Sequence, residues 1–218
     1  MGHKIKLVSI DGDGCLFAYT NVGSVFHSSW DALGLAYGLK EIWDERTNKY
    51  YKKGDFDKQW AEEDIAELTG KDIKQSEHIL YPIPYSPGVE EFLDFSKGKL
   101  VRGLLSTCVD IVGKKASEEK KLDFCFCNIL NRNNGNFSGT IDYLVPTWQK
   151  HLKIPDLCKK FGVMSSEICH VGDNENDISV GERVGMFVAY NPKKKEVANR
   201  ANHTIYDFRD LIKILDIK

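Results

Sequence analysis

The stretch Leu7-Val8-Ser9-Ile10-Asp11-Gly12-Asp13-Gly14 decides the fold, because an apolar run ends abruptly in two carboxylates and two glycines. The apolar residues from position 5 to position 10 predict a strand that is covered on both faces. Asp11 and Asp13 follow at its carboxyl end, where open α/β sheets bind their ligands, and residues two apart on an extended chain point the same way. Two carboxylates this close repel each other, so the pair indicates a hard metal ion, a shared proton, or both.

The composition is that of an ordinary globular protein, with 218 residues of which 42% are hydrophobic. A net charge of -2 gives no electrostatic footprint for nucleic acid, and no apolar run is long enough to span a membrane. The six cysteines form no CxxC pair, and the N-terminal residues run directly into the first strand with no signal peptide. These features predict a cytoplasmic protein with reduced thiols and with neither a nucleic-acid nor a membrane partner; its oligomeric state stays open.

A helical region follows the first strand. From position 26 to position 80 apolar residues recur at helical spacing and no strong strand signal appears, which predicts three or four short amphipathic helices. The stripe of Phe56 and Trp60 is interpreted as helix core rather than as a ligand site. We therefore predict a small helical cap over residues 18–82, inserted into an α/β core formed by residues 1–17 and 83–218.

The remainder of the chain alternates strands with helices, which predicts a parallel, Rossmann-like α/β sheet. Ser86 and Pro87 have the chemistry of a helix N-cap and first helical residue, and Gly162 closes a second predicted helix. The segment from Asp110 to Leu122 has the pattern of a charged surface helix, and Asn134-Gly135 predicts a β-hairpin. The predicted strands cover residues 100–105, 124–130, 137–141, 168–173, 186–190 and the neighbourhood of Ile205.

Polar side chains gather at three of the predicted strand ends, and a lysine precedes the last of them. Such carboxylates suit an oxygen-ligated Mg²⁺, and a hydroxyl, a lysine and strand-end N–H groups suit a phosphoryl group. One aspartate beside these cations could attack phosphorus, and a second could transfer protons to the leaving oxygen and from water. The residues are Asp11 and Asp13, Ser106 and Thr107, Lys150, and Asp173 and Asp177.

In this order and spacing, the motifs resemble those of the haloacid dehalogenase superfamily phosphatases, in the branch that includes phosphoserine phosphatase. The resemblance rests on Asp11-Gly12-Asp13, on Ser106, on Lys150, and on Gly172-Asp173 with Asp177 four residues later. Lys153 is a rival for the lysine position. The helical insert between the first two motifs also corresponds to a cap class of this family.

The resemblance implies a role for each residue. Asp11 is the implied nucleophile, and Asp13 the general acid and base. Asp11, Asp13 and Asp173 are the implied Mg²⁺ ligands, Asp13 through its carbonyl oxygen, and Asp177 supports the site by orienting Lys150 or a metal-bound water.

The phosphate-binding residues are implied in the same way. Ser106 and the N–H of Thr107 hold phosphate oxygens, and Lys150 neutralises negative charge on the nucleophile and the phosphate. Asn176 matches the phosphate-side asparagine of the family, and Gly12 lies in the turn that exposes backbone donors.

The substrate is less well defined than the chemistry. Phosphoserine phosphatases carry a glutamate where this chain has Thr20 and a cap arginine for the substrate carboxylate, whereas Arg46 is the only arginine of this cap. We therefore expect an Mg²⁺-dependent hydrolase of a small phosphate ester that acts through an aspartyl phosphate, with phosphoserine specificity open. A phosphotransferase or mutase with the same intermediate, and a non-catalytic phospho-binding or receiver-type module, are the alternatives.

Overall fold

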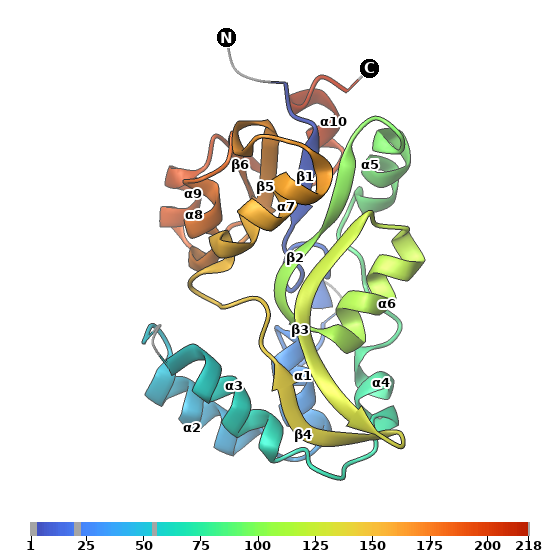
Figure 1. Cartoon of the computed structure of the whole chain (residues 1–218), viewed down its shortest axis with the longest axis vertical. Coiled ribbons are helices and arrows are strands. Elements are labelled where there is room, and N and C mark those ends of the chain that lie inside the picture. Colours follow the sequence, from blue (N-terminus) through green and yellow to red (C-terminus); the bar gives the residue numbers. More distant parts are fainter. Residues whose placement is uncertain (1–3, 20–22, 54–55, 218) are drawn as a thin grey trace.

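The computed structural model describes residues 4–19, 23–53 and 56–217, and its strands form one sheet in the order β4-β3-β2-β1-β5-β6-β7 (Figure 1). Every neighbouring pair is parallel except the hairpin of β3 and β4. The predicted α/β class, the parallel sheet and the hairpin are confirmed. The strands are β1 (Leu7–Ile10), β2 (Val101–Val109), β3 (Phe124–Asn133), β4 (Asn136–Asp142), β5 (Ile168–Gly172), β6 (Met186–Tyr190) and β7 (His203–Ile205).

Strand β1 lies at the centre of the sheet, with Leu7 in register with Val101 of β2 and with Ile168 of β5. Because all three strands are parallel, their carboxyl ends meet at one edge. The stretch that opens the sequence is therefore flanked on both sides by the other two strands that carry acidic or hydroxyl residues.

Apolar side chains of β1 alternate between two cores, one on each face of the sheet. Val8 and Ile10 pack in the larger core, whereas Leu7 packs in a second core with Ile154 and Leu157. This alternation explains why the strand reads as a continuous apolar run. The helices of the α/β part are α5 (Val89–Ser96), α6 (Asp110–Lys120), η3 (Lys150–Lys153), α7 (Ile154–Phe161), η4 (Ser165–Glu167), α8 (Glu175–Gly181), α9 (Lys195–Arg200) and α10 (Asp210–Ile214).

The predicted helical region forms a group of helices beyond the carboxyl end of the sheet (Figure 1). It joins the β3–β4 hairpin through main-chain hydrogen bonds, from the Gly70 N–H to the Phe137 carbonyl at 2.9 Å and from the Ile73 N–H to the Gly135 carbonyl at 3.2 Å. The boundaries at residues 18 and 82 stay a prediction. The helices are α1 (Ser29–Ala36), α2 (Lys40–Tyr50), α3 (Asp57–Ala66) and α4 (Lys74–Leu80).

Two predicted boundaries differ from the structure. Helix α5 begins at Val89 and not at Pro87, because the Ser86 hydroxyl donates to the Cys15 carbonyl and the left-handed Gly88 (φ 77°) precedes the helix. Strand β2 does not end at Ser106 but continues to Val109, with a shift of register against β3. Ser106 consequently lies in an irregular part of the strand.

Two predicted environments are also wrong. Helix α6 is not simply a surface helix, because its first turn is buried and Asp110 pairs there with Arg132 at 3.0 Å. Phe56 does not join a helix core: it precedes α3 and is exposed, because its partner Tyr50 covers only part of its ring. Within the described ranges, none of the helices has the length and apolar character needed to cross a bilayer.

Candidate active site

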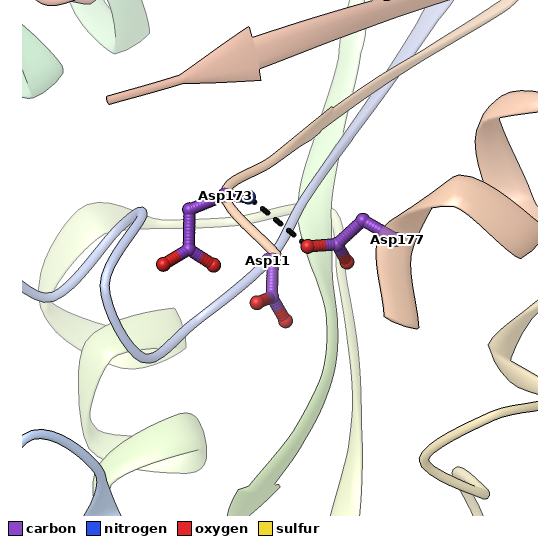
Figure 2. Close-up of side chains that lie close together, drawn as sticks. All are labelled: Asp11, Asp173 and Asp177. Carbon is purple, nitrogen blue, oxygen red and sulfur yellow. Dashed lines mark hydrogen bonds between the residues drawn. The ribbon is translucent and has the colours of Figure 1, made fainter. Parts of the chain in front are cut away.

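The carboxyl ends of β1, β2 and β5 open into one cavity of about 260 Å³ between the sheet and the α1–α3 helices. At the sheet end, Asp11, Asp13 and Asp173 line it, so the structure brings together the acids predicted to bind metal. Figure 2 shows Asp11 and Asp173 beside Asp177, which comes from the first turn of α8. Strand ends separated by more than 160 residues thus supply one group of carboxylates.

Lys150 is fully buried and joins two of these acids. Its Nζ donates to Asp11 Oδ1 at 2.7 Å and to Asp177 Oδ1 at 2.6 Å. Burial alone would lower the pKa of Lys150, but the carboxylates of Asp11 and Asp177 hold it above its ordinary value. Its predicted rival Lys153 pairs instead with Asp156, at 3.5 Å, outside the cavity.

Asp177 is saturated with hydrogen-bond donors. Its Oδ1 accepts from Lys150 and faces His170 Nε2 at 3.2 Å. Its Oδ2 accepts the N–H of Asp173 at 3.0 Å (Figure 2) and the N–H of Asn174 at 3.1 Å. Burial disfavours its charge, yet Lys150 and His170 bring the pKa of Asp177 below its ordinary range. With four donors around it, this carboxylate positions Lys150 and the β5–α8 turn and has no lone pair left for a metal.

Asp13 connects the first motif to the helical region. Its Oδ2 accepts the Ser29 hydroxyl at 2.7 Å, while its Oδ1 is buried with no hydrogen-bond partner in the described part of the chain. Burial raises the pKa of Asp13 to about 6 despite the hydrogen bond from Ser29. A carboxyl group that exchanges its proton near neutral pH suits a general acid and base.

The predicted phosphate-binding residues Ser106, Thr107 and Asn176 all line the same cavity. Gly12 packs so closely on the first of them that a Cβ at this position would lie 2.7 Å from Ser106 Oγ. Gly14 combines a positive φ of 87° with a Cβ position only 2.3 Å from Asp173 Oδ2. Both glycines therefore keep the space between β1 and its neighbours free of side chains.

The carboxylates of Asp11 and Asp173 fit a hard divalent cation. Oxygen atoms of Asp11, Asp173 and Asp177 lie within 4.8 Å of one another, and Asp173 Oδ1 is buried without a hydrogen-bond partner among the described residues. Burial raises the pKa of Asp173 to about 7, although Lys193 opposes this. Since Asp177 is saturated, Asp11 and Asp173 are the side chains with free oxygens for Mg²⁺, which prefers few carboxylates plus water and phosphate oxygens.

Sequence reasoning missed three residues of this site. Lys193 stands in the run Lys193-Lys194-Lys195, whose pattern is typical of a solvated helix start. It nevertheless lies 2.8 Å from Asp173 Oδ2, because it follows the carboxyl end of β6. Ser29 and the buried Asn128 also escaped notice; the Asn128 side chain bonds the carbonyls of Thr107 and Val145. Only the position of Lys193 after a strand end could have signalled its role.

Two aromatic residues of the predicted cap, Trp43 and Tyr19, lie in different environments. Trp43 lines the cavity, whereas Tyr19 is buried with its hydroxyl on the Leu80 carbonyl at 3.2 Å. Thr20 lies outside the described residues. His170 is a packed core histidine, bonded to Ser9 Oγ at 2.9 Å.

With this geometry in place, known proteins provide a comparison. Residues 49–210 match the model of the haloacid dehalogenase-like hydrolases. The chain belongs to this family. Its relatives include a phosphoserine phosphatase of Methanocaldococcus jannaschii, 26% identical over 99% of this chain and 98% of the relative. A phosphoserine phosphatase of Archaeoglobus fulgidus is 29% identical over 65% of this chain, but the match spans only 42% of that protein.

The fold comparison agrees with the family assignment. A solved phospho-aspartyl intermediate analogue of phosphoserine phosphatase matches this hydrolase with a TM-score of 0.78, at 24% identity, over 97% of this chain and 99% of that one. The prediction of a haloacid dehalogenase-like phosphatase, similar to phosphoserine phosphatases, is confirmed at the level of the family.

Proposed function

We propose that this hydrolase is an Mg²⁺-dependent phosphomonoesterase that cleaves a small phosphate ester through an aspartyl phosphate on Asp11. The observation that supports this most strongly is the shared cavity. It brings together Asp11 and Asp13 after β1, Ser106 from the irregular part of β2, and Asp173 after β5. The two relatives that are named phosphoserine phosphatases also support this proposal.

In the first step, an oxygen of the Asp11 carboxylate attacks phosphorus and the ester P–O bond breaks. Lys150, 2.7 Å from Asp11 Oδ1, holds the nucleophile and offsets negative charge. The leaving oxygen takes a proton from Asp13, whose Oδ1 is free among the described residues and whose Oδ2 is fixed by Ser29. The alcohol then departs, and phosphate remains bound to Asp11.

In the second step, water attacks the phosphorus of the aspartyl phosphate and gives its proton to Asp13. The P–O bond to Asp11 breaks, inorganic phosphate leaves, and both carboxyl groups return to their initial states. Ser106, the Thr107 N–H and Asn176 hold the phosphate oxygens in this proposal. Asp11, Asp173 and the Asp13 carbonyl would hold Mg²⁺, which would neutralise negative charge on the phosphoryl group.

Asp11→Asn is the decisive test, because the amide keeps the shape of the side chain but is no nucleophile. We expect the release of phosphate from an aryl phosphate in the presence of Mg²⁺ to fall by about 10⁴-fold or more. The matched control is Asp156→Asn, which removes an exposed carboxylate outside the cavity and should leave activity unchanged. Full activity of Asp11→Asn on every ester would refute the proposal.

A further inference from the structure

The cavity extends from the sheet toward the helices, and its far end has a distinct chemistry. The tryptophan side chains of Trp30 and Trp43 line it with ring centroids 6.3 Å apart, and Trp60 lines it further along. Trp30 is fixed at the boundary with the phosphate end, because its Nε1 donates to the Thr107 carbonyl at 2.9 Å. Whatever group is esterified to the phosphate would therefore contact aromatic rings. We call the part of the cavity that is lined by Trp30, Trp43 and Trp60 the leaving-group end.

Acidic residues dominate the charge of the leaving-group end. Lys40 is the one cation that lines it among the described residues, and its Nζ lies 2.8 Å from Asp44. The carboxylates that line it come from α1, α2 and α3 and are Asp31, Asp44, Asp57 and Asp64.

Asp57 is the buried carboxylate in this group that has no basic partner among the described residues, whereas the buried Asp64 pairs with Arg46. Asp57 is 5% exposed; its Oδ2 accepts the Trp148 N–H at 3.3 Å, but its Oδ1 makes no hydrogen bond in the described part of the chain. Burial raises the pKa of Asp57, although the N–H groups of Trp148 and Thr147 and the hydroxyls of Tyr143 and Thr147 oppose this. A cation bound in the cavity would relieve the cost of this buried charge.

Among the described residues, no basic side chain at this end is free to pair with a carboxylate on the leaving group. Arg46, the only arginine between residues 18 and 82, does not line the cavity. Its guanidinium is held by Asp64 at 3.0 Å and by Glu67 at 2.8 Å. Four lining carboxylates would instead repel a second anion.

We propose that the leaving group is a cationic amino alcohol without a carboxylate, whose ammonium group binds between the tryptophan rings and Asp57. Tryptophan faces attract ammonium cations, quaternary ammonium above all, and a carboxylate pairs with them by charge. This inference rests on the proposed phosphatase function and names its substrate class.

Two pairs of esters test the inference, because the members of each pair differ in one group. Phosphoethanolamine and phosphoserine differ only by the carboxylate, and phosphocholine and 3,3-dimethylbutyl phosphate differ only by the positive charge. We expect kcat/KM for the cationic, carboxylate-free member to be higher by at least about tenfold in one pair or both. A preference for phosphoserine, or equal rates within both pairs, would overturn the inference.

Variants of Asp57 test whether this residue causes a preference for cationic esters. Asp57→Asn should lower kcat/KM for the cationic ester by about tenfold and leave the neutral isostere unaffected, since only the charge is removed. Glu62→Gln is the matched control, because Glu62 lies on the same helix, is exposed and pairs with Lys58 outside the cavity. Equal losses on the cationic ester and its neutral isostere would show a structural effect and contradict the inference.

The same measurements separate this inference from the proposed function. Hydrolysis of an aryl phosphate without preference for cationic esters would leave the phosphatase proposal standing and refute the substrate class. If no ester is hydrolysed, the affinities of Asp11→Asn for phosphocholine and 3,3-dimethylbutyl phosphate still decide the matter. Tighter binding of phosphocholine would support the cationic subsite, and equal binding would refute it.

Discussion

Two buried carboxylates, Asp177 at the sheet end of the cavity and Asp57 at the leaving-group end, differ in how their charge is compensated. At the sheet end, Lys150 lies between Asp11 and Asp177, and Asp177 is surrounded by four donors. At the leaving-group end, Asp57 keeps an oxygen without a hydrogen-bond partner in the described chain. A buried network that is complete makes a site rigid, whereas an incomplete one leaves an interaction for a ligand to provide.

The largest effect should come from breaking the complete network at Lys150. Lys150→Met leaves Asp11 and Asp177 buried without their cation, so we expect about 3–5 kcal/mol of lost stability in urea denaturation and loss of phosphate release. Lys153→Met is the control, because its Nζ pairs with Asp156 at 3.5 Å outside the cavity. Similar losses in both variants would contradict the assignment of Lys150.

Removal of divalent cations tests the carboxylate oxygens at the sheet end that lack a hydrogen-bond partner in the described chain. Asp173 Oδ1 has no partner in the described chain, so we expect chelation to reduce phosphate release by at least about 100-fold and added Mg²⁺ to restore it. Asp173→Asn should raise the Mg²⁺ concentration that is needed for half-maximal activity. Unchanged activity after exhaustive chelation would exclude the metal proposal.

A smaller effect is expected at Ser29, which joins the helices to the sheet. Its hydroxyl donates to Asp13 at 2.7 Å and accepts the Val109 N–H at 3.2 Å, so Ser29→Ala leaves both groups short of a partner. We expect a loss of stability of about 1–3 kcal/mol and a lower kcat. The exposed Ser165, changed to alanine, should show neither effect in thermal unfolding and steady-state assays.

The smallest effect should come from Lys52, which forms an exposed ion pair with Glu175 of α8 at 2.9 Å. Lys52→Ala should change stability by less than about 1 kcal/mol, and the difference should vanish in high salt, because water and ions screen this pair. Urea denaturation at two ionic strengths measures it. A larger change that persists in salt would mean that the contact is more than a surface pair.

Much of this molecule could be predicted from sequence, and the reason is local. Asp11 and Asp173 were identified because each follows an apolar strand, and Ser106 because it follows the apolar residues of β2; parallel strands place these positions near one edge. Ser29 could not be found in this way, since its contact with Asp13 depends on how α1 packs. Lys193 stood in a charged run whose pattern indicates solvent rather than a site.

The leaving-group end escaped prediction for a related reason. The tryptophans recur at the spacing of a helix core, and periodicity alone cannot distinguish rings that face a core from rings that face a cavity. Trp43 does both, being 5% exposed and yet lining the cavity. The predicted boundary between cap and core likewise depends on packing, which the sequence pattern does not reveal.

The hydrogen bonds between the β3–β4 hairpin and residues 70–73 have a mechanical consequence. They attach the helices to the sheet at a point well away from the chain connections that enter and leave the helical region (Figure 1). A rotation of α2 and α3 that preserves these bonds must pivot near the hairpin. The displacement would then be greatest far from the hairpin, where Lys52 pairs with Glu175 and the ring of Tyr51 packs on Trp148, so a substrate would enter at that rim, past Tyr51 and Asn174.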